Sequence, residues 1–147
     1  MNRHLLSRSV HSRVIYAGTT ASATTTIDSA FIDMAGFEGL MIEGSLEATA
    51  TDNGMEILCS TDSTTTNAEE ILDSRAVATS TAILIDVHPW PVGKRYAFAR
   101  VIRTTTSKIG KITALKYGAR RMPIDNATST QVHKTVVLSS TGASTST

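Results

Sequence analysis

The chain has 147 residues, with fourteen Lys and Arg, thirteen Asp and Glu, and a formal net charge of +1. This length fits one domain with a sizeable core, and no apolar run is long enough to span a bilayer, so we expect no membrane partner. No apolar stretch with a cleavage site follows the basic N-terminus, so we expect synthesis in the cytoplasm.

The charged residues are sorted along the sequence. Acids dominate residues 28–86, where Arg75 is the only base, and Asp125 is the one acid outside that range. Residues 94–134 reverse the pattern, because Asp125 is the only acid among their bases. Such sorting favours surfaces that meet a partner, or copies of the same chain, through opposite charge.

Residues 1–13 are basic and polar, and they carry Arg3, Arg8 and Arg13. We interpret them either as an arm that orders against a partner or as a disordered tail, the usual state of termini. A short strand is predicted over residues 13–16. Residues 24–32 alternate in part, with Ile27 and Phe31 as expected core contacts.

Residues 40–51 alternate between apolar and polar positions, which predicts a strand with one face in the core. Asn53-Gly54 follows, and residues 55–60 form the next apolar run. An Asn-Gly pair between two such runs predicts a tight hairpin. Cys59, the only cysteine, lies in the second run, where we expect a buried and inert thiol.

The second half of the chain continues the strand pattern. Residues 67–73 fit either a short helix or an irregular edge strand. Further strands are predicted over residues 82–87, 96–102, 109–117 and 132–138. Trp90 lies between two prolines that interrupt this series, and it reads either as a packed loop anchor or as a sugar-stacking platform. Residues 139–147 form a Ser/Thr-rich tail of flexible composition.

Seven to eight strands at regular spacing, without a long helix, predict an all-β fold, an antiparallel β-sandwich or barrel. We expect three segments: an N-terminal arm over residues 1–13, one β-domain over residues 14–138, and the tail over residues 139–147.

The sequence carries none of the common nucleotide-binding, hydrolase or zinc-protease motifs, so we expect no enzyme, no cofactor and no metal. Asp52 and Asp62 are the best candidates for calcium, but turns explain both. Strand alternation places Tyr96, Phe98 and Arg100 on one face and Arg103 on the other. The basic strand is therefore a poor stacking platform, and we expect no direct contact with nucleic acid.

Three segments resemble a known family. Lys94-Arg95-Tyr96 leads one strand, and the strand that ends in Tyr117-Gly118 leads into Arg120-Arg121-Met122-Pro123. Together with residues 36–44, these segments resemble the head decoration, or cement, proteins of tailed bacteriophages.

The resemblance implies a jelly-roll-like sandwich, often a homotrimer, that bridges subunits on the outside of a capsid. It implies the major capsid protein as partner and the capsid exterior of the virion as location. Five arginines are the expected partner-binding residues: Arg3, Arg8, Arg13, Arg120 and Arg121. Two alternatives stay open, a head–tail connector or tail component and a carbohydrate-binding β-sandwich.

Overall fold

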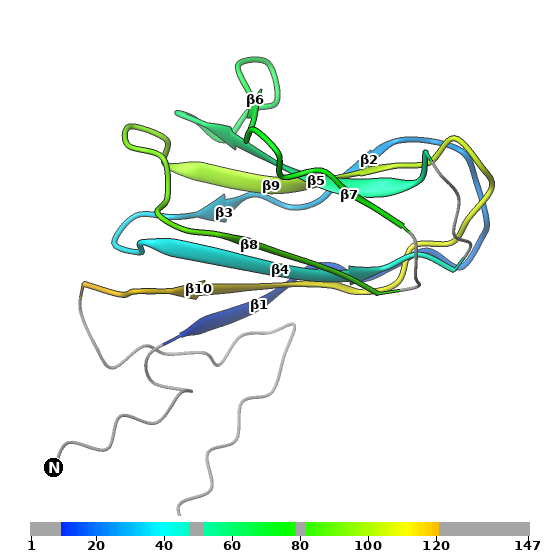
Figure 1. The fold of residues 1–147 in the computed structure, drawn as a ribbon, viewed down its shortest axis with the longest axis horizontal. Helices are drawn as coiled ribbons and strands as arrows, with labels where there is room; N and C mark the ends of the chain where they lie inside the picture. The colour runs from blue at the N-terminus through cyan, green and yellow to red at the C-terminus, as the bar shows by residue number, and fades with distance from the viewer. Residues whose placement is uncertain (1–9, 48–51, 79–81, 121–147) are drawn as a thin grey trace, which may run out of the picture.

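A computed structural model describes residues 10–47, 52–78 and 82–120, and its regular elements are all β-strands. Figure 1 shows them stacked in two layers. The strands are β1 (His11–Tyr16), β2 (Ile27–Asp28), β3 (Ile32–Asp33), β4 (Gly39–Ser45), β5 (Gly54–Ser60), β6 (Glu69–Glu70), β7 (Ala76–Val77), β8 (Ala82–Val87), β9 (Tyr96–Ile102) and β10 (Ile112–Tyr117). The all-β prediction is confirmed.

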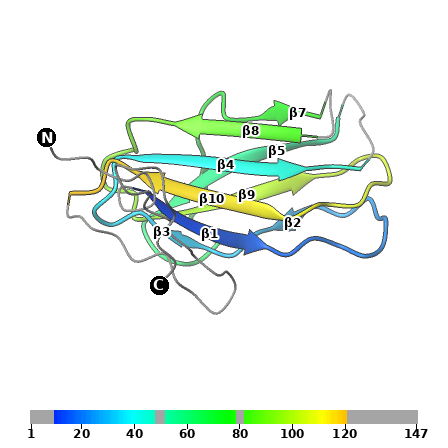
Figure 2. The ribbon, with the colours of Figure 1, turned by 90° about the horizontal axis from the view of Figure 1, so that it is seen from below.

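Both layers are antiparallel sheets. The four-stranded sheet has the order β1-β10-β4-β8, which Figure 2 shows from below. The other sheet runs β2-β9-β5-β6, with β3 also on β9 and β7 also on β5. If β2–β3 and β6–β7 each count as one interrupted strand, the first strand pairs with the last and the pairing continues inward to the middle of the chain. This nested pairing is a long ribbon wrapped into two layers, the jelly-roll arrangement.

The hairpin predicted at Asn53-Gly54 is wrong, because β4 and β5 belong to different sheets. The side chain of Asn53 is fully buried, and its oxygen accepts hydrogen bonds from the backbone N–H groups of Thr104 and Thr105, at 2.9 and 3.0 Å. At Gly54 a Cβ would lie 2.5 Å from the carbonyl oxygen of Ala76. Asn53 therefore belongs to a buried hydrogen-bond network, and Gly54 allows its strand to approach Ala76 closely.

The core lies between the two sheets and follows the predicted alternation of β4. Leu40, Ile42, Gly44 and Leu46 are buried, whereas Glu43 and Glu47 are exposed. The opposite layer contributes a set of inward-facing side chains from β5 and β9: Met55, Ile57, Ala97, Ala99 and Val101. Period-two patterning thus identified one wall of the core correctly.

A second apolar group lies on the other face of β9, away from the central core. Phe98 is fully buried there, and the ring of Phe31 meets it edge-on with 5.0 Å between centroids. Phe31 is therefore a packing residue of this outer group rather than of the central core. Ile27, in contrast, packs against the central core as predicted.

The positions of the strands also test the other predictions. Glu69–Glu70 is an edge strand, which decides between the two interpretations of residues 67–73. Cys59 is buried, and burial raises the pKa of its thiol, as expected for an inert cysteine. Strand β1 begins at His11, so the sheet includes the last residues of the predicted arm. Residues 1–9 of the arm, the strand predicted over residues 132–138 and the tail lie outside the described residues.

The described residues contain no helix that could span a membrane.

Two leucines on neighbouring strands test the assignment of the core. Leu40 of β4 is 0% exposed, whereas Leu84 of β8 is 59% exposed. We expect Leu40→Ala to lower the free energy of unfolding by about 2–5 kcal/mol, because it leaves a cavity between the sheets. Leu84→Ala should change it by less than about 1 kcal/mol. Urea denaturation measures both, and equal losses would contradict the assignment.

Candidate partner-binding end of the sandwich

Several strand ends meet at one end of the sandwich, which we call the cationic end. Strands β1, β4 and β9 begin there, and β3, β8 and β10 end there, because His11 lies opposite Lys116 and Tyr117 lies opposite Gly39. The connections over residues 34–38 and 88–95 close this end, on the left in Figure 1.

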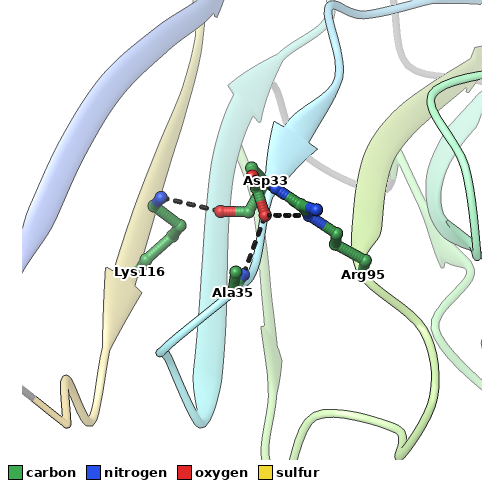
Figure 3. Close-up of polar contacts among 4 residues, drawn as sticks. All are labelled: Asp33, Ala35, Arg95 and Lys116. Carbon is green, nitrogen blue, oxygen red and sulfur yellow. Dashed lines mark hydrogen bonds and ion pairs between the residues drawn. The ribbon is translucent and has the colours of Figure 1, made fainter.

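Asp33, the last residue of β3, joins the two sheets at the cationic end. Its carboxylate accepts hydrogen bonds from the guanidinium of Arg95, the shortest at 2.8 Å, and from the backbone N–H of Ala35 at 2.9 Å. Its backbone oxygen accepts a hydrogen bond from Lys116 Nζ of β10, at 2.8 Å. Figure 3 shows Asp33 between the two cations. The hydrogen bond from Arg95 lowers the pKa of Asp33.

A large recess of about 750 Å³ lies between the two connections, and Arg120 also lines it. Gly36 and Gly93 shape its walls, because each has a positive φ, 84° and 81°, that other residues rarely adopt. The backbone N–H of Arg120 donates to the carbonyl of Gly36, at 2.9 Å. The exposed side chain of Arg120 has no ion pair with any carboxylate of the described residues.

Trp90 holds the two walls of the large recess together. Its backbone N–H donates to the carbonyl of Glu38 at 2.8 Å, and its indole N–H donates to the carbonyl of Lys94 at 2.6 Å. The ring is partly buried and packs against the core. These contacts favour the interpretation of Trp90 as a loop anchor.

A small recess of about 170 Å³ lies on the other side of the Asp33 segment. Two strands of the four-stranded sheet and one strand of the other sheet line it. The lining residues are His11, Arg13, Ile32, Asp33, Ala114 and Lys116.

Two of the five predicted partner-binding arginines therefore lie at the cationic end. Arg13 lines the small recess and Arg120 lines the large one. Arg3, Arg8 and Arg121 lie outside the described residues. Lys116 was not among the predicted residues, although a signal was present: Ile112, Ala114 and Lys116 share one face of β10, and a lysine on a core face is unusual.

Bases from residues 94–134 (the basic block) pair with acids from residues 28–86 (the acidic block) within the chain. Ion pairs join Arg100 to Asp28 at 2.7 Å and Arg95 to Asp33 at 2.8 Å. Lys94 pairs with Glu69 at 2.9 Å and Lys108 with Glu47 at 3.4 Å. Each pair connects the basic block to the acidic block, so strand pairing explains much of the sorting that suggested a partner.

Of these four ion pairs, only the pair of Arg100 with Asp28 has both side chains less than a third exposed, at 30% and 29%. Arg100 of β9 lies opposite both Asp28 of β2 and Glu56 of β5. Glu56 is only 7% exposed, and burial raises the pKa of its carboxyl group, with nearby Glu70 acting in the same direction. This row of charges lies on the sheet face that points away from the central core.

Three candidate side chains on and just after β9, Phe98, Arg100 and Arg103, make contacts inside the molecule. Phe98 is fully buried, and the guanidinium of Arg100 lies over its ring, 5.7 Å from the centroid. Arg103 is 2% exposed and donates to Thr25 and to the carbonyl of Ser107. None of these side chains offers a free face to a base.

The turn interpretation of Asp62 is also supported by its contacts. Its carboxylate accepts hydrogen bonds from the hydroxyl groups of Thr64 and Ser60, at 2.6 and 3.1 Å. The side chain thus closes a local turn.

No protein-family model and no curated protein matches the chain. Among solved structures, the chain is similar to SPBc2 prophage-derived protein YomS, with a TM-score of 0.45 and 10% sequence identity. The alignment covers 73% of this chain and 91% of that chain. A likeness at this level carries no argument about function.

The buried carboxyl of Glu56 predicts a pH effect on stability. A raised pKa means that the folded state holds this proton more tightly, so wild-type stability falls as the pH rises from the ordinary value of 4.5 through the folded value. We expect Glu56→Gln to remove this slope and to be the more stable protein at neutral pH. Thermal unfolding between pH 4 and pH 8 measures the difference, with exposed Glu43→Gln as the matched control. A variant that is less stable than wild type at neutral pH would contradict the assignment.

The Asp33 ion pair predicts the opposite trend. Its pKa is lowered, so its contribution is complete above the ordinary value of 3.8 and is lost as the pH falls through the folded value. Because the Asp33 side chain is 42% exposed, we expect Asp33→Asn to cost at most about 1 kcal/mol at neutral pH. The two proteins should converge in acid. Exposed Asp52→Asn serves as control, and a loss that persists in acid would exclude the ion pair as its cause.

Proposed function

We propose that this chain is a structural virion protein that binds the outside of a phage capsid and bridges its subunits. The observation that carries the proposal is the cationic end of a jelly-roll sandwich, where Arg13, Lys116 and Arg120 have no carboxylate partner in an ion pair among the described residues. Cations whose charge is not neutralised by an ion pair attract an acidic surface.

Chain direction adds to this argument. Residues 1–9 are attached just before the start of β1, and residues 121–147 are attached at Arg120, shortly after the end of β10. Both attachment points are at the cationic end. Arg3, Arg8 and Arg121 are therefore covalently tethered to the same end as Arg13 and Arg120.

The resemblance to decoration proteins implied a jelly-roll-like sandwich, and the strand order agrees with that expectation. The proposal includes a homo-oligomer, with a trimer favoured, and the major capsid protein as partner. Many copies on a repeating shell gain avidity, so each contact can be modest. The proposed role needs no enzyme activity and no cofactor.

Co-sedimentation with bare capsids tests the proposal. We expect salt-dependent binding that is about tenfold weaker in the double variant Arg13→Gln/Arg120→Gln. The control, Arg75→Gln/Lys111→Gln, removes the same charge from exposed positions at the opposite end of the sandwich and should bind like wild type.

Equal binding by both double variants would contradict a role for the cationic end, and no binding by the wild type would contradict the capsid as partner. Copy number separates the alternative function. A decoration protein occurs in proportion to the capsid subunits, whereas a connector occurs in far fewer copies.

A further inference from the structure

The small recess is lined by two cations, Arg13 and Lys116, and by one carboxylate residue, Asp33, whose side chain pairs with Arg95. Lys116 Nζ donates to the backbone oxygen of Asp33 and lies 4.3 Å from the centroid of the Phe37 ring. Neither contact carries a full negative charge. The Asp33 carboxylate is engaged by Arg95 on the other side of the segment, as Figure 3 shows.

Two further observations show that the charge of Lys116 is only partly compensated. Burial lowers the pKa of Lys116, and the positive charge of Arg13 acts in the same direction, although Asp33 opposes both. No carboxylate of the described ranges forms an ion pair with Lys116 or Arg13. Two cations thus face the same recess and repel each other.

The size and walls of the recess suit a small anion. Its 170 Å³ equals several water molecules at about 30 Å³ each, which is enough for a carboxylate or phosphate group. Ile32 and Ala114 supply apolar walls, and charge-assisted hydrogen bonds are stronger where water is excluded.

We propose that the small recess binds one oxyanion, a carboxylate or a phosphate, between Arg13 and Lys116. The anion would come either from an acidic side chain of a neighbouring subunit or from free phosphate in solution. The first source rests on the proposed function, whereas the second does not.

The position of the recess gives the anion a structural effect. Arg13 lies on the edge strand β1, Lys116 lies on β10, and Asp33 lies on β3 of the other sheet. An anion that contacts both cations ties the edge strand to its neighbour. Binding should therefore raise the midpoint of thermal unfolding.

Titration of the full chain with sodium phosphate, sodium acetate and sodium chloride at constant ionic strength tests the proposal. Amide chemical shifts and the unfolding midpoint are the readouts. We expect saturable shifts around residues 11–13 and 114–116 with phosphate or acetate, and none with chloride. Lys116→Met, which keeps an aliphatic chain beside Phe37, should weaken binding about tenfold.

Arg13→Gln provides a second variant at an exposed position that should fold normally, and it should weaken binding as well. Lys111→Met, at the opposite end of β10, is the matched control and should bind like wild type. Tighter binding of acetate identifies a side-chain carboxylate as the source, and tighter binding of phosphate identifies the free ion.

Equal responses to all three salts, or equal affinities of wild type and Lys116→Met, would overturn the proposal. The titration contains no capsid, so its failure leaves the capsid-binding result unaffected. Conversely, failure to bind capsids would not remove a saturable phosphate response.

Discussion

The antiparallel pairing of β9 with acidic strands on both sides is the constraint on which the rest of the structure depends. Strand β9 lies between β2 and β3 on one side and β5 on the other. This position places Arg100 between Asp28 and Glu56. Arg100 is stable at the centre of the sheet because Asp28 pairs with its guanidinium at 2.7 Å, and a partly buried cation without such a partner is costly. Ion pairs within the chain therefore account for part of the sorting of charge along the sequence, and the cations of the cationic end without such a pair among the described residues are the ones we propose for other molecules.

Those remaining cations are arranged by the same topology. The nested pairing of a jelly roll brings the first and last strands of the described chain together, so Arg13 and Lys116 lie near each other although they are far apart in sequence. Asp33 separates the two recesses, with its carboxylate toward Arg95 and its backbone oxygen toward Lys116. The contacts of Asp33 thus hold the end of β3, which lies between the two recesses. The two recesses differ in shape and lining. The large one is open and is lined by Trp90 and other residues of the connections, whereas the small one is lined by strand residues.

The alternation of residues 40–47 was sufficient to predict a strand and its buried face, because the period depends only on local geometry. The hairpin at Asn53-Gly54 failed because the role of Asn53 is set by Thr104 and Thr105, about fifty residues away in sequence, which no local pattern reveals. The site was predictable in part. Arg13 and Arg120 of the predicted residues lie at the cationic end, whereas Lys116 could be recognised only once the inward face of β10 was known. Charge sorting indicated that the blocks attract each other, yet only the strand order shows that they do so within one molecule.

The single thiol of Cys59 has a practical consequence. It lies on β5, which is flanked by β9 on one side and by the short edge strands on the other. Because the thiol is buried and its pKa is raised, a soluble maleimide reaches it only when these strands separate. The rate of alkylation therefore measures how often the sandwich opens transiently. Comparing this alkylation rate for free chains and for chains bound in a larger particle would show how much assembly reduces their transient opening.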